Sequence, residues 1–265
     1  MRGQRTNDNT QRRAWPTLCR VAAFALSAVA AHAGELLSDT FSYSDGPIVG
    51  AAGSLWIHHS GNSAEANVAE GQLQLTQAET EDISAVLPGA PFTSAGGGSL
   101  YAGFTLRFDT LPTKPGTYFA HFKNNTTGFR ARVFTSTLNA GAGSFRLGIG
   151  NGTDADANSG QIATDLTLGL TYSLVVRYDL STAASTLWLN PAVESDPSVT
   201  AADASTPIDV TAFAFRQSSE SGNGMGGLVV DNLRLGTTFV DVVPEPATWA
   251  LLVFGLGGFS LARRR

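Results

Sequence analysis

Acidic side chains at short, regular spacing are the most chemically suggestive feature in the middle of the sequence. Asp154, Asp156, Asn158 and Asp165 supply oxygen side chains, the first three at alternate positions and the last eleven residues after Asp154. Such side chains can converge on one calcium ion. The pattern departs from a helix-loop-helix calcium loop, because Gly160 comes one place late and the last ligand is Asp. Asn, Asp and Gly also build ordinary hairpin loops, and we favour that interpretation. We therefore predict that the protein has no cofactor, with calcium bound at this loop as the alternative.

Carboxylates that could hydrolyse a glycan are a second candidate. Such hydrolysis needs two carboxyl groups about 5 to 9 Å apart that flank the scissile bond. The nearest match is Glu79-Thr-Glu81-Asp82, whose spacing does not suit a single strand face. We interpret this run as solvated charge in a loop. We therefore predict no catalytic residue and a protein that is not an enzyme, with an exported glycan-active hydrolase as the alternative.

Histidines and aromatic residues suggest binding rather than catalysis. His58, His59 and His121 follow the N-terminal segment, and adjacent side chains on a strand point to opposite faces, which disfavours a zinc site. Trp56 and Trp188 could stack on sugar rings. Packing in a core is the other interpretation of both indoles, and the sequence leaves it open.

The elements that position these residues are β-strands. Leu100, Ala102, Phe104, Leu106 and Phe108 alternate with other residues, which is the period of a half-buried strand. Gly, Pro and Asn clusters separate further strands. These strands are expected near 73–75, 129–133, 145–149, 172–178, 186–190, 208–215 and 228–235. We predict an all-β antiparallel sandwich of the jelly-roll type, formed by one domain over residues 34–241.

Charge excludes one class of partner. The chain has 265 residues, of which 15% are charged. Between residues 34 and 262 there are seven Arg and two Lys against twenty-one Asp or Glu, a net charge of −12. Such a charge repels nucleic acid, so we expect no nucleic-acid partner.

The N-terminal residues 1–33 have the pattern of a secretory signal peptide. Arg20 precedes an apolar run of about eleven residues, which ends in Ala31-His-Ala33. That run is too short to cross a bilayer, which needs about 20 residues. We predict export through the secretion translocon and cleavage by signal peptidase at Ala31 and Ala33. The single cysteine, Cys19, would be removed.

The C-terminal residues 242–265 have three parts. Pro244, Glu245 and Pro246 interrupt the backbone and are followed by an uncharged stretch, 247–262. A helix of that length is about 24 Å long, short of a hydrocarbon core of about 30 Å, and inserts if the bilayer thins. The chain then ends in a basic cluster that holds this end in the cytoplasm. This cluster is Arg263, Arg264 and Arg265.

This tripartite tail resembles the PEP-CTERM sorting signal of Gram-negative bacteria. The resemblance implies that exosortase, a membrane enzyme, recognises Pro244, Glu245 and Pro246, while 247–262 is a transient inner-membrane helix and the arginines stop transfer. It also implies a cell-surface or extracellular protein linked to exopolysaccharide. A simple tail-anchored membrane protein is the alternative.

A second resemblance covers the middle of the chain. Segments 39–46, 117–122 and 230–238 are similar to laminin-G-like and concanavalin-like jelly rolls of exported bacterial proteins. The resemblance implies that the first and last strands pair, with Phe41 near Leu233. This fold contains lectins, glycan hydrolases and adhesion modules, so polysaccharide is the partner that it suggests and the fold does not choose among these functions.

Overall fold

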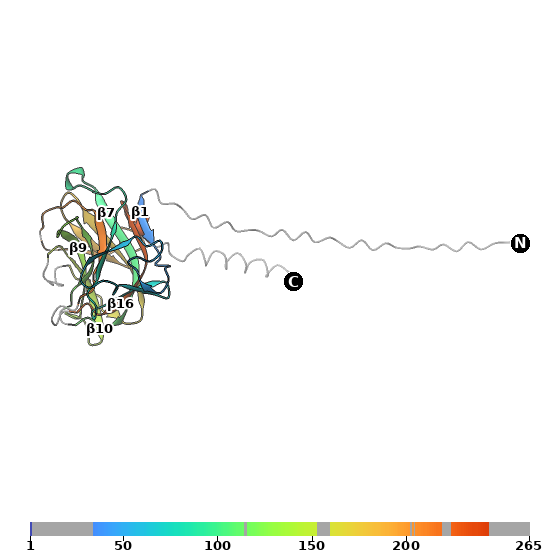
Figure 1. Ribbon diagram of the computed structural model, residues 1–265. Helices are drawn as coiled ribbons and strands as arrows, with labels where there is room; N and C mark the ends of the chain where they lie inside the picture. The colour runs from blue at the N-terminus through green and yellow to red at the C-terminus, as the bar shows by residue number, and fades with distance from the viewer. Residues whose placement is uncertain are drawn as a thin grey trace. The chain divides into compact units, whose positions relative to one another are not determined.

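The protein is a two-layer β structure. The computed structural model describes residues 1, 34–113, 116–152, 160–201, 203, 205–218 and 224–243. These residues form two antiparallel sheets (Figure 1), which confirms the predicted all-β antiparallel sandwich. The expected N-terminal signal helix and C-terminal hydrophobic helix lie outside the described residues.

The larger sheet contains the first and last strands. Its nine members are β1 (Glu35–Asp39), β2 (Gly46–Pro47), β4 (Asn67–Ala69), β5 (Gln72–Thr76), β7 (Ser99–Thr110), β12 (Thr171–Asp179), β13 (Ser185–Leu189), β14 (Ser198–Thr200) and β16 (Gly227–Gly236). Their order is β14-β13-β12-β7-β16-β5-β4-β2, and β1 pairs with β16. Asp39 lies opposite Leu233, so the expected pairing of the first and last strands is confirmed.

The smaller sheet has seven strands. They are β3 (Trp56–Ser60), β6 (Asp82–Val86), β8 (Tyr118–Lys123), β9 (Phe129–Ser136), β10 (Ser144–Gly150), β11 (Leu166–Thr167) and β15 (Ala212–Phe215). Their order is β11-β10-β9-β8-β15-β6-β3. The strand expected over 208–215 begins only at Ala212, because Val210 forms an isolated bridge with Phe92 instead of continuing the ladder.

The core lies between the two sheets and is rich in aromatic rings. All the alternating β7 residues from Leu100 to Phe108 are buried, as the period of two predicted. Phe104 packs edge to face against Phe119 at 6.5 Å and Phe215 at 5.7 Å between ring centroids. Burial of such a side chain contributes about 1.5–3 kcal/mol, so these contacts hold the sheets together.

A second apolar cluster covers the other face of β7. Helix α1 (Phe239–Val242) packs there, with the Phe239 ring 5.4 Å from Trp188 and 6.3 Å from Tyr101. A Cβ atom on Gly103 would lie 2.1 Å from the Val242 carbonyl oxygen, so the helix approaches this closely only because residue 103 is Gly. Val243 is still buried, two residues past the boundary predicted at 241.

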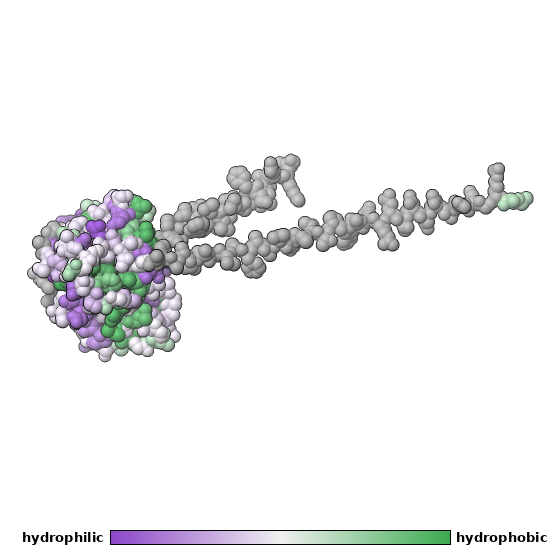
Figure 2. Space-filling model, turned by 90° about the horizontal axis from the view of Figure 1, so that it is seen from above, coloured by the Kyte–Doolittle hydropathy of each residue, from purple (hydrophilic) through white to green (hydrophobic). Residues whose placement is uncertain are grey.

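Polar and apolar residues share the outer surface. Figure 2 shows hydrophobic atoms in patches among hydrophilic ones on the face in view. Some large hydrophobic side chains are more than half exposed, which is normal for a globular domain. Within the described part of residues 34–243 they are Leu55, Ile57, Val86, Leu170, Val193 and Val240. Leu55, Ile57 and Val86 come from or lie beside the paired strands β3 and β6, and the others come from separate segments. A short 3-10 helix, η1, spans Ser94–Gly96.

The packing of α1 yields a matched test. Val242→Ala removes two methyl groups from a fully buried side chain, whereas Val240→Ala removes the same groups at a residue that is 66% exposed. We expect Val242→Ala to lower the free energy of unfolding by about 1–3 kcal/mol and Val240→Ala to change it by less than about 0.5 kcal/mol. Denaturant unfolding measures both, and equal effects would contradict the packing of α1 on β7.

Candidate functional site

The described part of the chain reaches Val243, the residue before the predicted Pro-Glu-Pro motif. Val242 and Val243 are buried against β7 and its neighbours, and Pro244 is the next residue. Pro244, Glu245, Pro246, the terminal arginines and the predicted cleavage residues Ala31 and Ala33 lie outside the described residues. Among the residues that are described, no helix has the length and apolar character to cross a membrane.

Trp56 is buried in the core rather than exposed for stacking. Its Nε1 donates a 2.7 Å hydrogen bond to Asp39 Oδ2, and its ring stacks on Phe41 at 6.0 Å. The same carboxylate oxygen accepts a hydrogen bond from the Tyr43 hydroxyl, and Oδ1 accepts one from the Phe41 amide. Burial, followed by the bond to Asp39, raises the pKa of Tyr43 to about 12. The predicted sugar-stacking role of Trp56 is therefore not available in this fold.

Trp188 is buried as well, on the opposite side of the larger sheet. Its indole packs against Phe239, and Nε1 donates a hydrogen bond to the Glu194 carbonyl oxygen at 3.1 Å. The Arg177 guanidinium lies 5.7 Å from the ring centroid. Because Phe239 of helix α1 and Arg177 both pack against the ring, this indole presents no free face to a sugar. Of the two interpretations left open for the indoles, the structure supports packing.

The predicted calcium residues fall mostly outside the description. Asp154, Asp156 and Asn158 are not among the described residues. Asp165 is, and its Oδ1 accepts a 2.6 Å hydrogen bond from Arg146 Nε, while Oδ2 accepts one from the Gly141 amide. Both partners lower the pKa of Asp165. No group of three His, Cys, Asp or Glu that could hold a metal ion occurs within the described part of the chain.

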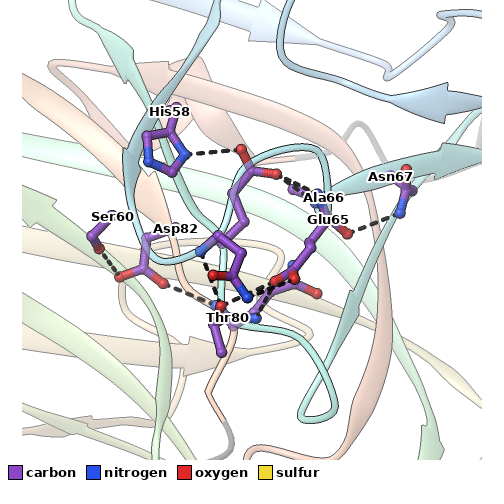
Figure 3. A network of polar contacts seen from close by, with 10 residues as sticks. His58, Ser60, Glu65, Ala66, Asn67, Thr80 and Asp82 are labelled. Carbon is purple, nitrogen blue, oxygen red and sulfur yellow. Dashed lines mark hydrogen bonds and ion pairs between the residues drawn. The ribbon is translucent and has the colours of Figure 1, made fainter.

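The run around Glu81 is not the solvated loop that we expected. Glu81 is fully buried, and its Oε2 accepts 2.7 Å hydrogen bonds from the Glu65 and Ala66 amides. His58 Nδ1 lies 3.1 Å from Oε1, and a dashed line from the labelled His58 in Figure 3 marks this contact. The expectation of solvation is wrong for Glu81 because the turn between β3 and β4 folds over it and needs an acceptor for its amides. This carboxylate has a structural function in the loop.

Asp82 lies beside this network with a different environment. Its Oδ2 accepts a hydrogen bond from the Ser60 hydroxyl at 2.8 Å, and Oδ1 accepts one from the Gln217 amide at 3.2 Å (Figure 3 shows the Ser60 contact). Burial raises the pKa of Asp82 to about 6, with Ser60 and Arg216 opposing that shift. A carboxyl group with such a pKa can exchange a proton near neutral pH.

His59 and His121 come together although they lie far apart in the sequence. Their ring centroids are 6.4 Å apart on the outer face of the smaller sheet. Burial, followed by nearby positive charge, lowers the pKa of His59 to about 4. The pKa of His121 lies well below its usual value for the same first cause. The sequence did not predict this proximity, because the pattern of alternating strand faces relates only neighbouring residues such as His58 and His59.

A hollow on the surface was also missed from the sequence. A cavity of about 580 Å³ lies where the β6–β7, β8–β9 and β14–β15 connections meet. Its polar rim includes Ser94, Asn124, Asn125, Asp209 and Thr211. Asp209 Oδ1 accepts hydrogen bonds from the Ser94 amide and hydroxyl, which fixes one wall. The only sequence signal was the Asn- and Thr-rich segment at 124–127, since nothing near Asp209 predicts its neighbours.

The histidine pair predicts how stability depends on pH. An unfolded histidine has a pKa of about 6.5, so below that pH the unfolded chain binds protons that the folded histidines resist. We expect the stability contributed by the neutral pair to be complete above pH 6.5 and to be lost as the pH falls toward 4. His121→Phe should reduce this loss, as urea unfolding at several pH values measures.

Asp82 provides the opposite control. Its raised pKa favours the protonated folded form, so it destabilises the fold as the pH rises from about 4 through 6. Asp82→Asn should therefore steepen the loss of stability on acidification.

A His121→Phe variant whose stability depends on pH as in the wild type would contradict the buried, neutral state of His121.

Comparisons with solved structures return lectins among the matches. Lectin II from Ulex europaeus is 18% identical, covers 76% of this chain and 98% of its own, and has a TM-score of 0.45. Peanut lectin is 16% identical with coverages of 76% and 97% and a TM-score of 0.47. A sialidase is 13% identical with a TM-score of 0.46, and the match spans 83% of this chain but 21% of that one. With TM-scores below 0.5, these likenesses support no argument about ligand or activity.

Sequence comparison identifies a known motif in the C-terminal tail. No curated protein matches the chain as a relative. Residues 242–265 match the PEP-CTERM protein-sorting motif, which confirms the resemblance found in the tail. This motif implies an exported protein that passes through a membrane and is processed by exosortase.

Proposed function

We propose that this chain is an exported, non-enzymatic surface or matrix protein of a Gram-negative cell, with the β-sandwich as cargo and the tail as a removable sorting signal. The observation that supports this most is the match of residues 242–265 to the sorting motif, whose first two residues, Val242 and Val243, are buried. A signal peptide at 1–33 would direct the chain to the secretion translocon and signal peptidase. Linkage to exopolysaccharide follows from the resemblance of the tail.

The hydrogen bonds of two buried carboxylates, Glu81 and Asp39, support the non-enzymatic assignment. Glu81 accepts hydrogen bonds from two backbone amides and contacts His58 Nδ1. Asp39 accepts hydrogen bonds from Trp56, Tyr43 and the Phe41 amide. Hydrogen bonds that a carboxylate accepts stabilise its ionised form, so they lower its basicity. A hydrolase on this fold would need two carboxyl groups free to flank one bond.

Saccharide binding is the molecular role that we propose for the sandwich. The cavity of about 580 Å³ has hydroxyl, amide and carboxylate groups on its rim and Pro91, Pro207 and Ile208 between them. Sugars combine hydroxyl groups with apolar C–H faces, so a mixed lining of this kind suits them. Asn125 is exposed on this rim.

The sorting proposal is tested on the tail itself. Replacing Pro244, Glu245 and Pro246 with Ala should stop processing, because the recognised extended backbone is lost. We expect the uncleaved chain to accumulate in the membrane fraction, and mass spectrometry of C-terminal peptides measures this. Val240→Ala, an exposed change just upstream, is the control. Mature wild-type protein that still contains Arg263, Arg264 and Arg265 would instead support a simple tail anchor.

The saccharide proposal is tested on the rim of the cavity. Asn125→Ala should lower the signal on a glycan array by about tenfold or more, since a hydrogen bond to a sugar hydroxyl is lost and its partner is left unpaired. Thr127→Ala alters an exposed neighbour that does not line the cavity and should leave the profile unchanged. Equal profiles for wild type and Asn125→Ala would reject this site.

A further inference from the structure

Five basic side chains gather on the outer face of the smaller sheet. In β15, Phe213 and Phe215 point into the core, so Ala214 between them points outward. His121 on β8 and Ser84 on β6 lie opposite Ala214 and share its face. We call the group around them the cationic cluster, which consists of His59, His121, Lys123, Arg132 and Arg216.

Small residues allow this cluster to converge. Ser84 and Ala214 have short side chains and are buried on this face of the sheet between β3 and β8. The His59 ring can therefore reach across β6 and β15 to within 6.4 Å of the His121 ring. A larger side chain at position 214 would occupy that space.

Buried nitrogen atoms in the cluster have no hydrogen-bond partner. His121 is fully buried, yet neither of its ring nitrogens has a partner, and the same is true of His59 Nδ1 and Arg132 Nε. Buried polar atoms in proteins are nearly always paired, so unpaired ones need an explanation. A ligand with acceptor oxygens would supply the missing partners.

The surrounding charge selects the sign of that ligand. The charged groups that act on His121 are Arg132, His59, Arg216 and Lys123, and all of them are cationic when protonated. A metal cation is therefore disfavoured beside this pair of imidazoles, whereas an anion is attracted.

Two carboxylates lie beside the cationic cluster. Asp203 Oδ2 accepts hydrogen bonds from the Asn151 and Gly152 amides and lies on the Arg132 side. Asp82, near Arg216, is held by Ser60 and Gln217. Lys123, Arg132 and Arg216 nevertheless bring three cationic side chains together on this face. This concentration of cations is unusual within residues 34–262, whose net charge is −12.

Aromatic rings are interleaved with the cations. The Tyr118 ring lies 4.4 Å from the Arg216 guanidinium and 5.1 Å from that of Arg132. Phe129 packs on His121 at 4.5 Å, and Arg132 lies 5.5 Å from its centroid. Tyr118, Phe129 and Arg216 are partly exposed, whereas Arg132 is buried beneath them. Guanidinium groups pair with carboxylates, and aromatic rings contact the C–H face of sugars.

We propose that the cationic cluster, with Tyr118 and Phe129, binds the carboxylate of an acidic saccharide, such as a uronate unit of a polysaccharide. This assignment rests on the proposed role as an exported saccharide-binding protein and names the class of its ligand. The site is distinct from the cavity beside Asn125, although Lys123 adjoins Asn124 on its rim. Protonation of the imidazoles in the bound state adds donors, so binding strengthens as the pH falls.

Calorimetry on the full chain in a mild detergent tests the proposal. The probes are a galacturonate hexamer, a neutral galactose hexamer of equal length, and inorganic phosphate. We expect the acidic hexamer to bind at least about tenfold more tightly than the neutral one at pH 6, because charged hydrogen bonds are gained. We also expect its affinity to be higher at pH 5.5 than at pH 8.

Two variants and one control locate the binding. Lys123→Gln should weaken acidic-hexamer binding severalfold, and His121→Phe should flatten its pH dependence while the chain keeps its near-ultraviolet circular dichroism. Arg107→Gln removes a cation that pairs with Asp109 on the larger sheet and should have no effect. An equal loss in Arg107→Gln, equal binding of both hexamers, or binding of phosphate alone would each overturn the proposal. None of these results bears on tail processing or on the Asn125 cavity, so failure here is distinguishable from failure of the proposed function.

Discussion

Strand β7 is buried on both faces, and much of the molecule is arranged around that constraint. One face supplies Phe104 and Phe108 to the aromatic core, which joins the two sheets. The other face supplies Tyr101 and Gly103, and helix α1 packs against them. A strand in this position must pair on both edges, which β12 and β16 provide. Because α1 packs on this face, Val243, the residue before Pro244, is buried against the sandwich.

The outer faces of the two sheets have different chemistry for a steric reason. On the larger sheet, Gly103 permits the backbone of α1 to approach closely, and the face is closed by apolar contacts. On the smaller sheet, Ser84 and Ala214 permit long basic and aromatic side chains to fold inward instead. Small residues therefore serve both faces, but one is covered by the chain itself and the other by side chains with unpaired nitrogen atoms.

Buried acids have a consistent use in this domain. Asp39 and Glu81 each accept several hydrogen bonds from amides or from aromatic side chains close in space. Each holds a loop against the sandwich, where an unpaired amide would be costly. The acidic character of the sequence is thus partly structural. Asp241 is buried as well, whereas acids such as Asp109 and Glu194 are exposed and repel anionic partners.

The sequence alone determined what depends on neighbours along the chain. The period of two predicted β7, β10 and β12 closely, because alternation of apolar residues reports that one strand face is buried. The tail motif was recognisable because its three parts are contiguous. The burial of Trp56, Trp188 and Glu81 was decided only by the tertiary structure, since alternation gives the face of a side chain but not what covers it. The approach of His59 to His121, and of Asp209 to Asn125 around one cavity, depends on strand order and sheet curvature. Residues distant in the sequence meet there for reasons that no local pattern contains.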